Sequence, residues 1–347
     1  MSEIIFKRVA PPTAQSVYAC IDYIIAHSTL TAERIGRKCL LKINAMSREL
    51  LPGRNTSPWV LDAVLKSLKE RFPQTEFIVA DNDVAGYAQF REACQNWGYN
   101  EIAKRYDVKI INLSDDELEP VDTGNPLCSI LEFPKTVMSA DSIINLPVLK
   151  THVLSGITCC LKNHWGMLPR CRYQHHTQLP EVIAEINRQI KHTVYNIVDA
   201  TICIEGSGPK TGRPKICSVI FGGADRVAVD AFAMKFMGMP FASSVHVGNS
   251  ERAGVGLSNF TVTGDQFSPD PFEQPQSGSD LVSSLEKKLR ALPVIGELLY
   301  SPSIAKVLGY IGTKYNEIVW FNLHGKKYIQ QIIVPSPYYP EFKDLLP

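Results

Sequence analysis

Short apolar segments alternate with amphipathic segments over the first 240 residues of this chain, and few folds accommodate that rhythm. Apolar runs of strand length lie at residues 39–43, 77–80, 108–113, 142–146, 194–198 and 216–221. Helical periodicity lies between them, at 58–68, 87–97, 181–190 and 224–237. Strands that alternate with helices in this order build parallel or mostly parallel sheets. We therefore predict an α/β fold with mostly parallel sheets, flanking helices and two lobes.

The character of the sequence changes near residue 260, which suggests three parts. We predict a core over 1–260, with a division between lobes near 120–150. Residues 261–280, rich in Pro, Gln, Ser and Gly, read as a linker or long loop. Residues 281–347 would form an accessory subdomain with a helix at 281–292 and a hairpin at 317–334, turning at Leu323-His324-Gly325. Such a hairpin is a candidate homodimer interface.

Charge and cysteine content narrow the partners and the compartment. The 36 Lys and Arg nearly balance the 35 Asp and Glu, so nucleic acid is not an expected partner. The sequence holds no run of about 20 apolar residues, so we expect no transmembrane segment. Nine cysteines without a secretory signal predict reduced thiols and a cytoplasmic location.

The segment from residue 145 to 176 has the highest density of reactive side chains. It carries two Lys-x-His triplets, Lys150-Thr151-His152 and Lys162-Asn163-His164, directly after a predicted strand. Ligands of open α/β sheets bind beyond the carboxyl ends of strands. A lysine can hold an anion or act as a nucleophile, and a histidine can move protons or bind metal. We therefore predict Lys150, His152, Lys162 and His164 as catalytic residues. The alternative is a solvated lysine beside a histidine that caps the backbone.

The same segment supplies most of the predicted substrate-binding residues. They are Asn163, Gly166, Arg170, Arg172, His175 and His176. Arginine forks match carboxylate and phosphate groups, so the basic turn is suited to clamp a small anionic molecule. The alternative is that Asn163 and Gly166 only terminate a helix, and that the basic turn is a surface loop.

A second candidate segment is the glycine-rich stretch from residue 199 to 214. It lacks both the dinucleotide fingerprint and the Walker loop, but its backbone N–H groups could still cradle an anion, with Gly206, Gly208 and Lys210 as contacts. Asp199 and Glu205 flank this loop, and with His152 they are our predicted metal ligands. The alternative is a flexible connection. Asp230, amid apolar helix residues, needs a partner if it is buried.

The spacing of the cysteines argues against an iron–sulphur cluster held by this chain alone. Such clusters use closely spaced thiolates such as C-x₂-C-x₂-C, and structural zinc uses paired C-x₂₋₄-C. Neither spacing occurs here. Only Cys159, Cys160 and Cys171 lie near the candidate chemistry, so a self-contained cluster is not expected.

Taken together, several motifs resemble the domain-of-unknown-function 362 family over about residues 35–260. They are LLKINA, NLPVLKTH, LKNHWGMLP, IVDA, EGSGPKTGRP and ADRVAVDAFAMKFMG. Members are commonly labelled iron–sulphur-centre proteins because many carry a ferredoxin-type cysteine module, which this sequence lacks. The resemblance implies an α/β fold and a shared pocket. The implied pocket residues are Lys150, His152, Lys162, Asn163, Gly166, Asp199, Glu205, Gly206, Gly208, Pro209, Asp225 and Asp230.

These patterns favour an enzyme that acts on a small anionic molecule in an interlobe pocket lined by Lys, His and carboxylates. Proton transfer, isomerisation and a redox step all suit such a site. A metal ion or metal-containing cofactor is a candidate, by analogy with nickel-pincer racemases, which also place lysine and histidine at a cleft. Two alternatives stay open. One is a non-catalytic iron–sulphur or electron-transfer module that obtains its cluster with a partner, and the other is a metabolite-binding scaffold.

Overall fold

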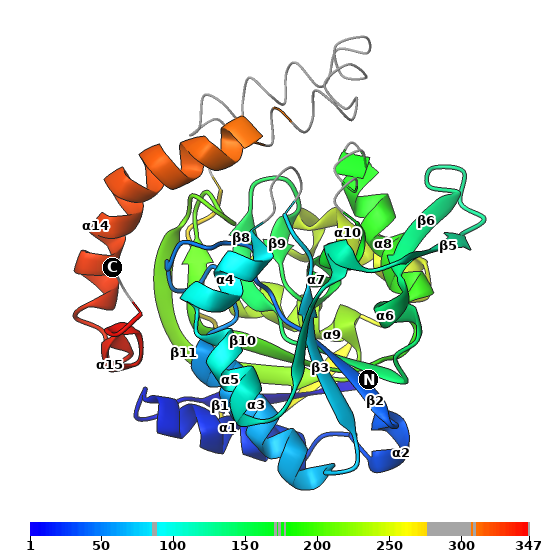
Figure 1. The fold of residues 1–347 in the computed structure, drawn as a ribbon, viewed down its shortest axis with the longest axis horizontal. Helices are drawn as coiled ribbons and strands as arrows, with labels where there is room; N and C mark the ends of the chain where they lie inside the picture. Colours follow the sequence, from blue (N-terminus) through cyan, green and yellow to red (C-terminus); the bar gives the residue numbers. More distant parts are fainter. Residues whose placement is uncertain are drawn as a thin grey trace.

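In the computed structural model the chain is organised around one large twisted sheet with helices on both faces (Figure 1). The structure describes residues 1–84, 89–169, 172, 175–176, 178–275, 307 and 310–345. The strands of the large sheet are β1 (Ser2–Arg8), β2 (Lys38–Lys42), β3 (Glu76–Asp81), β4 (Lys109–Asn112), β7 (Ser142–Asn145), β8 (Val148–His152), β9 (Gly156–Thr158), β10 (Thr193–Glu205), β11 (Arg213–Gly223) and β12 (Phe260–Gly264). A separate two-stranded sheet pairs β5 (Leu118–Asp122) with β6 (Ile130–Pro134).

The large sheet is mixed but mostly parallel, which confirms the predicted fold class. Its order is β12-β1-β11-β10-β7-β2-β3-β4, and β8 pairs with both β10 and β9. The pairs β1–β12, β10–β7, β10–β8, β2–β7, β2–β3 and β3–β4 are parallel. Pairs β1–β11, β10–β11 and β8–β9 are antiparallel. Strands from both sides of the predicted 120–150 division therefore share one sheet, while the domain limits themselves stay a prediction.

Helices cover both faces of this sheet. They are α1 (Ala14–Ala26), α2 (Ala32–Ile35), α3 (Pro58–Arg71), α4 (Phe90–Asn96), α5 (Tyr99–Arg105), α6 (Lys135–Met138), α7 (Cys160–Asn163), α8 (Leu179–Gln189), α9 (Arg226–Phe236), α10 (Val245–Arg252), α14 (Lys326–Tyr328) and α15 (Tyr339–Phe342). Alternation along β2 divides the core, because Cys39 and Leu41 pack into one apolar cluster and Leu40 into the other. Helices α1 and α3 belong to the first cluster, and α8 and α9 to the second.

Local sequence signals explain where two of these helices begin. The Asp225 carboxylate accepts hydrogen bonds from the N–H groups of Val227 (2.9 Å) and Ala228 (3.2 Å), so Asp225 caps the start of α9. Helix α3 begins at Pro58, as predicted, but the Ser57 side chain makes no cap bond. The Ser57 N–H donates instead to Asp199 on β10, at 2.8 Å.

The predicted C-terminal hairpin is wrong, because this part of the chain is helical. Helical segments follow one another over Tyr315–Gly325, Lys326–Tyr328 and Ile329–Ile333, seen in orange in Figure 1. Gly325, the expected turn, has helical φ and ψ of −59° and −51°. Some of the β-branched and aromatic residues that suggested strands form one buried face of a helix, while Ile318 and Val319 are exposed. Trp320, Phe321, Ile329 and Ile333 are buried on that face.

Two further predictions concern the helix at 281–292 and the linker at 261–280, which the structure describes only in part. The helix expected at 281–292 lies outside the described residues. Residues 266–275 form neither helix nor strand. Without the hairpin, the predicted homodimer has lost the element that suggested it and stays a prediction.

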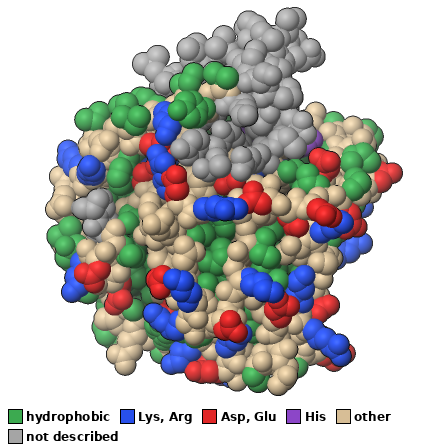
Figure 2. All heavy atoms as spheres, in the orientation of Figure 1, with side chains coloured by type: hydrophobic (Ala, Val, Ile, Leu, Met, Phe, Trp, Pro, Cys, Tyr) green, Lys and Arg blue, Asp and Glu red, His purple; other side chains and the backbone are tan. Residues whose placement is uncertain are grey.

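The surface agrees with the balanced composition. On the face in Figure 2, Lys and Arg side chains lie among Asp and Glu side chains, and the described residues form no broad basic field there. Within the described ranges, none of the helices has the length and apolar content needed to cross a membrane.

Candidate functional site

The Lys/His segment and the glycine-rich loop lie against each other at the carboxyl end of β8. The Thr151 hydroxyl donates to the Gly206 carbonyl at 2.8 Å, and the Val153 N–H donates to the Gly208 carbonyl at 3.2 Å. A Cβ at Gly208 would overlap the Thr151 carbonyl oxygen, so only glycine allows this approach. The two predicted segments are therefore in direct contact, through hydrogen bonds between β8 and the glycine-rich loop.

Lys150 lies on β8 and is fully buried. Its ammonium donates to the Asn44 side-chain oxygen and to the Arg54 carbonyl oxygen, and lies 3.3 Å from the Met46 sulphur. All three neighbouring acceptors are uncharged. Burial, followed by the nearby Arg54 guanidinium, lowers the pKa of Lys150 to about 7. Lys150 thus tethers the 44–54 loop and adds a positive charge that no directly bonded carboxylate balances.

Four asparagines continue this hydrogen-bond network through the core. The Asn44 amide donates to the Asn163 oxygen (3.0 Å), and the Asn163 amide to the Asn145 oxygen (2.8 Å). The Asn145 amide then reaches the Asn196 oxygen at 3.1 Å. Asn163, predicted to contact substrate, is therefore fixed between the 44–54 loop and the end of β7 by side-chain bonds.

His152 ends β8, with its ring held in one orientation. Its Nδ1 accepts from the N–H groups of Leu154 (3.1 Å) and Ser155 (3.3 Å), so the neutral ring carries its proton on Nε2. Burial lowers the pKa of His152 well below its usual value, and the charges of Lys162 and His176 act in the same direction. His152 is therefore a neutral hydrogen-bond donor near pH 7.

Lys162, on α7, is partly exposed and lies beside His152. Its Nζ sits 5.3 Å from the Trp165 ring centroid, a cation–π contact. Across the described parts of the chain its ammonium has neither a hydrogen-bond acceptor nor a carboxylate partner. Burial, and then the Arg172 charge, lower the pKa of Lys162 to about 7. We call Lys150, His152 and Lys162 the lysine–histidine cluster.

A neighbouring ion pair was not predicted. Lys42 ends β2 and is fully buried, and its ammonium bonds to Asp81 Oδ1 (2.6 Å) and to the Ile43 carbonyl (2.7 Å). The other Asp81 oxygen accepts the Ala45 N–H at 2.7 Å. A Cβ at Gly166 would lie 2.9 Å from Asp81 Oδ1, so Gly166 covers this pair. The signal was present in the sequence as a lone lysine in the apolar run 39–43 and an aspartate at the end of the run 77–80.

Arg54 is a second residue that the sequence analysis missed. It is fully buried, and its guanidinium donates to the Ser47 hydroxyl (3.1 Å), the Asn316 oxygen (3.1 Å) and the Lys210 carbonyl oxygen. It also lies 5.0 Å from the Trp320 ring centroid. Arg54 therefore joins the glycine-rich loop to the C-terminal helix. No spacing rule pointed to it, because Lys210 and Asn316 are distant from it in sequence.

The predicted metal ligands His152, Asp199 and Glu205 are not brought together as one set. Asp199 is buried and accepts bonds from the Ser57 N–H and from the Thr201 N–H and hydroxyl. Glu205 pairs with Arg213 at 2.5 Å and accepts the Glu273 N–H at 3.1 Å. Both carboxylates are therefore occupied by contacts that hold the fold.

Other predicted residues lie in structural positions. His164 is buried, and its Nδ1 lies 2.8 Å from the Asn187 side-chain oxygen. Arg172 donates to the carbonyls of Leu168 (3.2 Å) and Asp83 (2.8 Å). Lys210 contributes its carbonyl oxygen to Arg54.

The basic turn lies next to the cluster. His176 contacts the Trp165 ring edge-on, with 5.4 Å between centroids. His175 and Arg172 line a shallow pocket with Leu168 and Glu132. Arg170 lies outside the described residues, as does Cys171.

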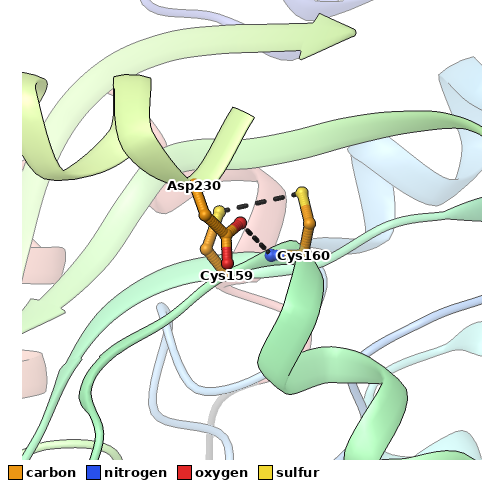
Figure 3. Close-up of side chains that lie close together, drawn as sticks. All are labelled: Cys159, Cys160 and Asp230. Carbon is orange, nitrogen blue, oxygen red and sulfur yellow. Dashed lines mark hydrogen bonds between the residues drawn. The ribbon is translucent and has the colours of Figure 1, made fainter. Parts of the chain in front are cut away.

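On the other side of α7, the described residues bring one set of metal-ligand atoms together. The Cys159 and Cys160 sulphurs and an Asp230 carboxylate oxygen all lie within 4.8 Å of one another (Figure 3). Asp230 accepts the Cys160 N–H at 2.7 Å and the Leu161 N–H at 3.1 Å. The partner that the sequence analysis required for Asp230 is therefore the start of α7. Burial raises the pKa of Asp230 to about 7.

The chain is an α/β protein with a mixed sheet, and its polar candidate site lies beyond the carboxyl ends of the strands. A family model described as "Domain of unknown function (DUF362)" matches residues 39–235, so the chain belongs to the DUF362 family. A relative is the thylakoid-associated protein sll1697 of Synechocystis sp., 26% identical over 230 residues, which are 63% of this chain and 69% of the relative.

Two solved structures show a limited similarity to this chain. The lactate racemase apoprotein from Thermoanaerobacterium thermosaccharolyticum has a TM-score of 0.43 and 13% identity, over 66% of this chain and 56% of that one. A protein from Thermotoga maritima has a TM-score of 0.37 and 10% identity, over 70% and 59%. The matches span less than two thirds of either solved chain and concern the fold alone.

Proposed function

We propose that this protein is an enzyme that binds a small anionic molecule at the lysine–histidine cluster and transfers a proton to or from it. The observation that carries the proposal is Lys162, a lysine with a lowered pKa and no acceptor among the described residues. An ammonium without a carboxylate partner is suited to hold an anionic group.

The three members of the cluster have different parts in this proposal. With a pKa of about 7, Lys162 is present both as an amine and as an ammonium at neutral pH, which is the condition for general acid–base catalysis. His152 donates from Nε2 to the anion, since its Nδ1 is occupied by two backbone N–H groups. Lys150, whose pKa is also about 7, adds positive charge when it is protonated and holds the 44–54 loop in place.

Asp199 and Glu205 have no place in this scheme as pocket carboxylates, because other groups occupy their oxygens. The lysine, whose pKa lies near 7, takes the acid–base part instead. A metal-containing cofactor at this cluster is an expectation from sequence that the proposal does not use.

The proposal is tested by binding and by hydrogen exchange on the same ligands. A panel of small carboxylates and inorganic phosphate is titrated by calorimetry, with Trp165 fluorescence as a second signal because that ring contacts Lys162. Bound carboxylates are then incubated in D2O, and NMR follows the loss of C–H signals. We expect binding and exchange in the unaltered protein.

Two variants and a matched control give the test its specificity. Lys162→Met should weaken binding by about tenfold to a hundredfold, the range for a lost charge-assisted bond, and should abolish exchange. His152→Gln should weaken binding less. Lys66→Met, at an exposed lysine on α3, should leave both unchanged. Unaltered binding by Lys162→Met would refute the proposal, and binding without exchange in the unaltered protein would favour the metabolite-binding scaffold.

A further inference from the structure

Within the part of the chain that the structure describes, the buried group formed by Cys159, Cys160 and Asp230 has no lysine or arginine in direct contact. All three side chains are completely buried. They lie where β9 meets α7, with Asp230 extending from α9 towards the two cysteines (Figure 3). Burial raises the pKa of both thiols, to about 11 for Cys159, so without a metal they stay protonated.

A fourth donor, His246 on α10, points at the same carboxylate. Its Nε2 is 4.0 Å from Asp230 Oδ2, and this buried nitrogen has no hydrogen-bond partner among the described residues. The side chain is fully buried, so water does not satisfy the nitrogen from outside. A buried imidazole nitrogen that no described residue bonds lies 4.0 Å from a carboxylate that is itself within 4.8 Å of two thiol sulphurs, and a metal ion would complete this arrangement.

The second ring nitrogen of His246 is held as in known metal sites. Its Nδ1 lies 3.2 Å from the Ser244 hydroxyl, which donates to the Ser155 carbonyl at 2.6 Å. Metal-binding histidines commonly use their other ring nitrogen in such a bond, which fixes the ring orientation.

The spacing of the two sulphurs suits a tetrahedral ion. The two sulphurs are 3.9 Å apart. With zinc–sulphur bonds of about 2.3 Å, the edge of a tetrahedral site is about 3.8 Å. The corresponding nitrogen–oxygen edge is about 3.3 Å, so binding would draw His246 inwards from its 4.0 Å separation.

We propose that Cys159, Cys160, Asp230 and His246 hold one zinc ion in a closed, structural site. Two thiolates, one imidazole and one carboxylate are ligands that zinc accepts, and four protein ligands leave no open position for substrate. Binding would release both thiol protons to solvent and tie the start of α7 to α9 and α10.

The test is the metal content of the intact chain. The protein is produced without a histidine tag in zinc-supplemented medium, and elemental analysis should give close to one zinc per chain. Production with cobalt(II) should give sulphur-to-cobalt charge-transfer absorption and the intense ligand-field bands of tetrahedral cobalt. This readout requires no substitution, so it stays decisive even if a variant misfolds. A folded protein without zinc and without the cobalt bands would overturn the proposal.

Variants assign the ligands. Cys159→Ser and Cys160→Ser should lose the metal, and His246→Gln should lower zinc affinity by about tenfold or more. Cys203→Ser is the matched control, because Cys203 is equally buried but lies outside the group, and it should keep the metal. Metal retained by both ligand-serine variants, or a disulfide between Cys159 and Cys160 found by mass spectrometry in place of metal, would refute the site. Lys162→Met should keep its zinc, so failure of the anion-binding proposal and failure of this one are distinguishable.

Discussion

Lys42 and Lys150 are both completely buried on strands of the same sheet, but the fold treats their charges in opposite ways. Lys42 has a carboxylate partner at 2.6 Å. Lys150 has only an amide oxygen, a carbonyl oxygen and a thioether. Asp81 balances the charge of Lys42 directly. The protonated Lys150 has no such carboxylate among its bonded neighbours, so its positive charge adds to that of Lys162.

The difference separates a structural lysine from a candidate functional one. A buried charge without a counter-ion is costly, and desolvation lowers the pKa of the lysine in response. Positions of this kind concentrate at functional sites because a ligand can provide the missing charge. Lys42 and Asp81 instead fix the loop after β2 through the Ala45 N–H. Variants that alter the Lys42–Asp81 pair and variants that alter Lys150 test this difference separately.

The largest effect is expected from breaking the balanced pair. Asp81→Asn would leave Lys42 charged, buried and unpaired, and should lower the free energy of unfolding by about 3–5 kcal/mol. Urea denaturation measures it. The double variant Lys42→Met/Asp81→Asn should recover part of the loss, since no buried charge remains. A loss below about 1 kcal/mol in the single variant would mean that the pair is not structural.

A smaller effect is expected from the pH dependence of the unbalanced lysine. The pKa of Lys150 is about 7 in the folded chain and near 10.5 when unfolded. Between these values the unfolded chain binds a proton that the folded chain does not, so stability should rise with pH. From pH 7 to pH 9 this gain is about 2 kcal/mol, and below pH 7 it levels off.

Lys150→Met isolates that contribution. The variant should lose this share of the stability gain between pH 7 and pH 9, as followed by urea denaturation at both values. Lys66→Met, at an exposed position, should keep the full gain. If Lys150→Met and the unaltered protein show the same pH dependence, Lys150 is not the uncompensated charge that the comparison requires.

The sequence predicted the scaffold better than the site because strands and caps are local patterns. The apolar run 39–43 and the Asp225 cap depend on neighbours within a few residues. The same locality explains the failed hairpin. Over 317–334 the alternating apolar residues fit a strand as well as a helix, and only packing against the core selects the helix.

Only some residues of the candidate site could be predicted from the sequence. Lys150, His152 and Lys162 stood out because two identical triplets are close together. Arg54 and His246 did not. Lys210 and Asn316, which Arg54 bonds, and Asp230, which His246 faces, lie more than 15 positions away in sequence. Asp199 and Glu205 were predicted as metal ligands, but in the structure their oxygens accept bonds from backbone N–H groups and from an arginine.

The smallest effect tests whether the asparagine network holds Lys150 where its charge remains unbalanced. Asn163→Ala removes the acceptor of the Asn44 amide and the donor to Asn145, which should lower the free energy of unfolding by about 1–2 kcal/mol. Asn44 would also become free to turn away from Lys150, so the pH-dependent gain should change together with the stability. Asn96→Ala is the control, because Asn96 bonds the exposed Arg48 carbonyl outside the network. A drop in stability with an unchanged pH dependence would show that the network supports the core alone, and that β8 by itself fixes Lys150.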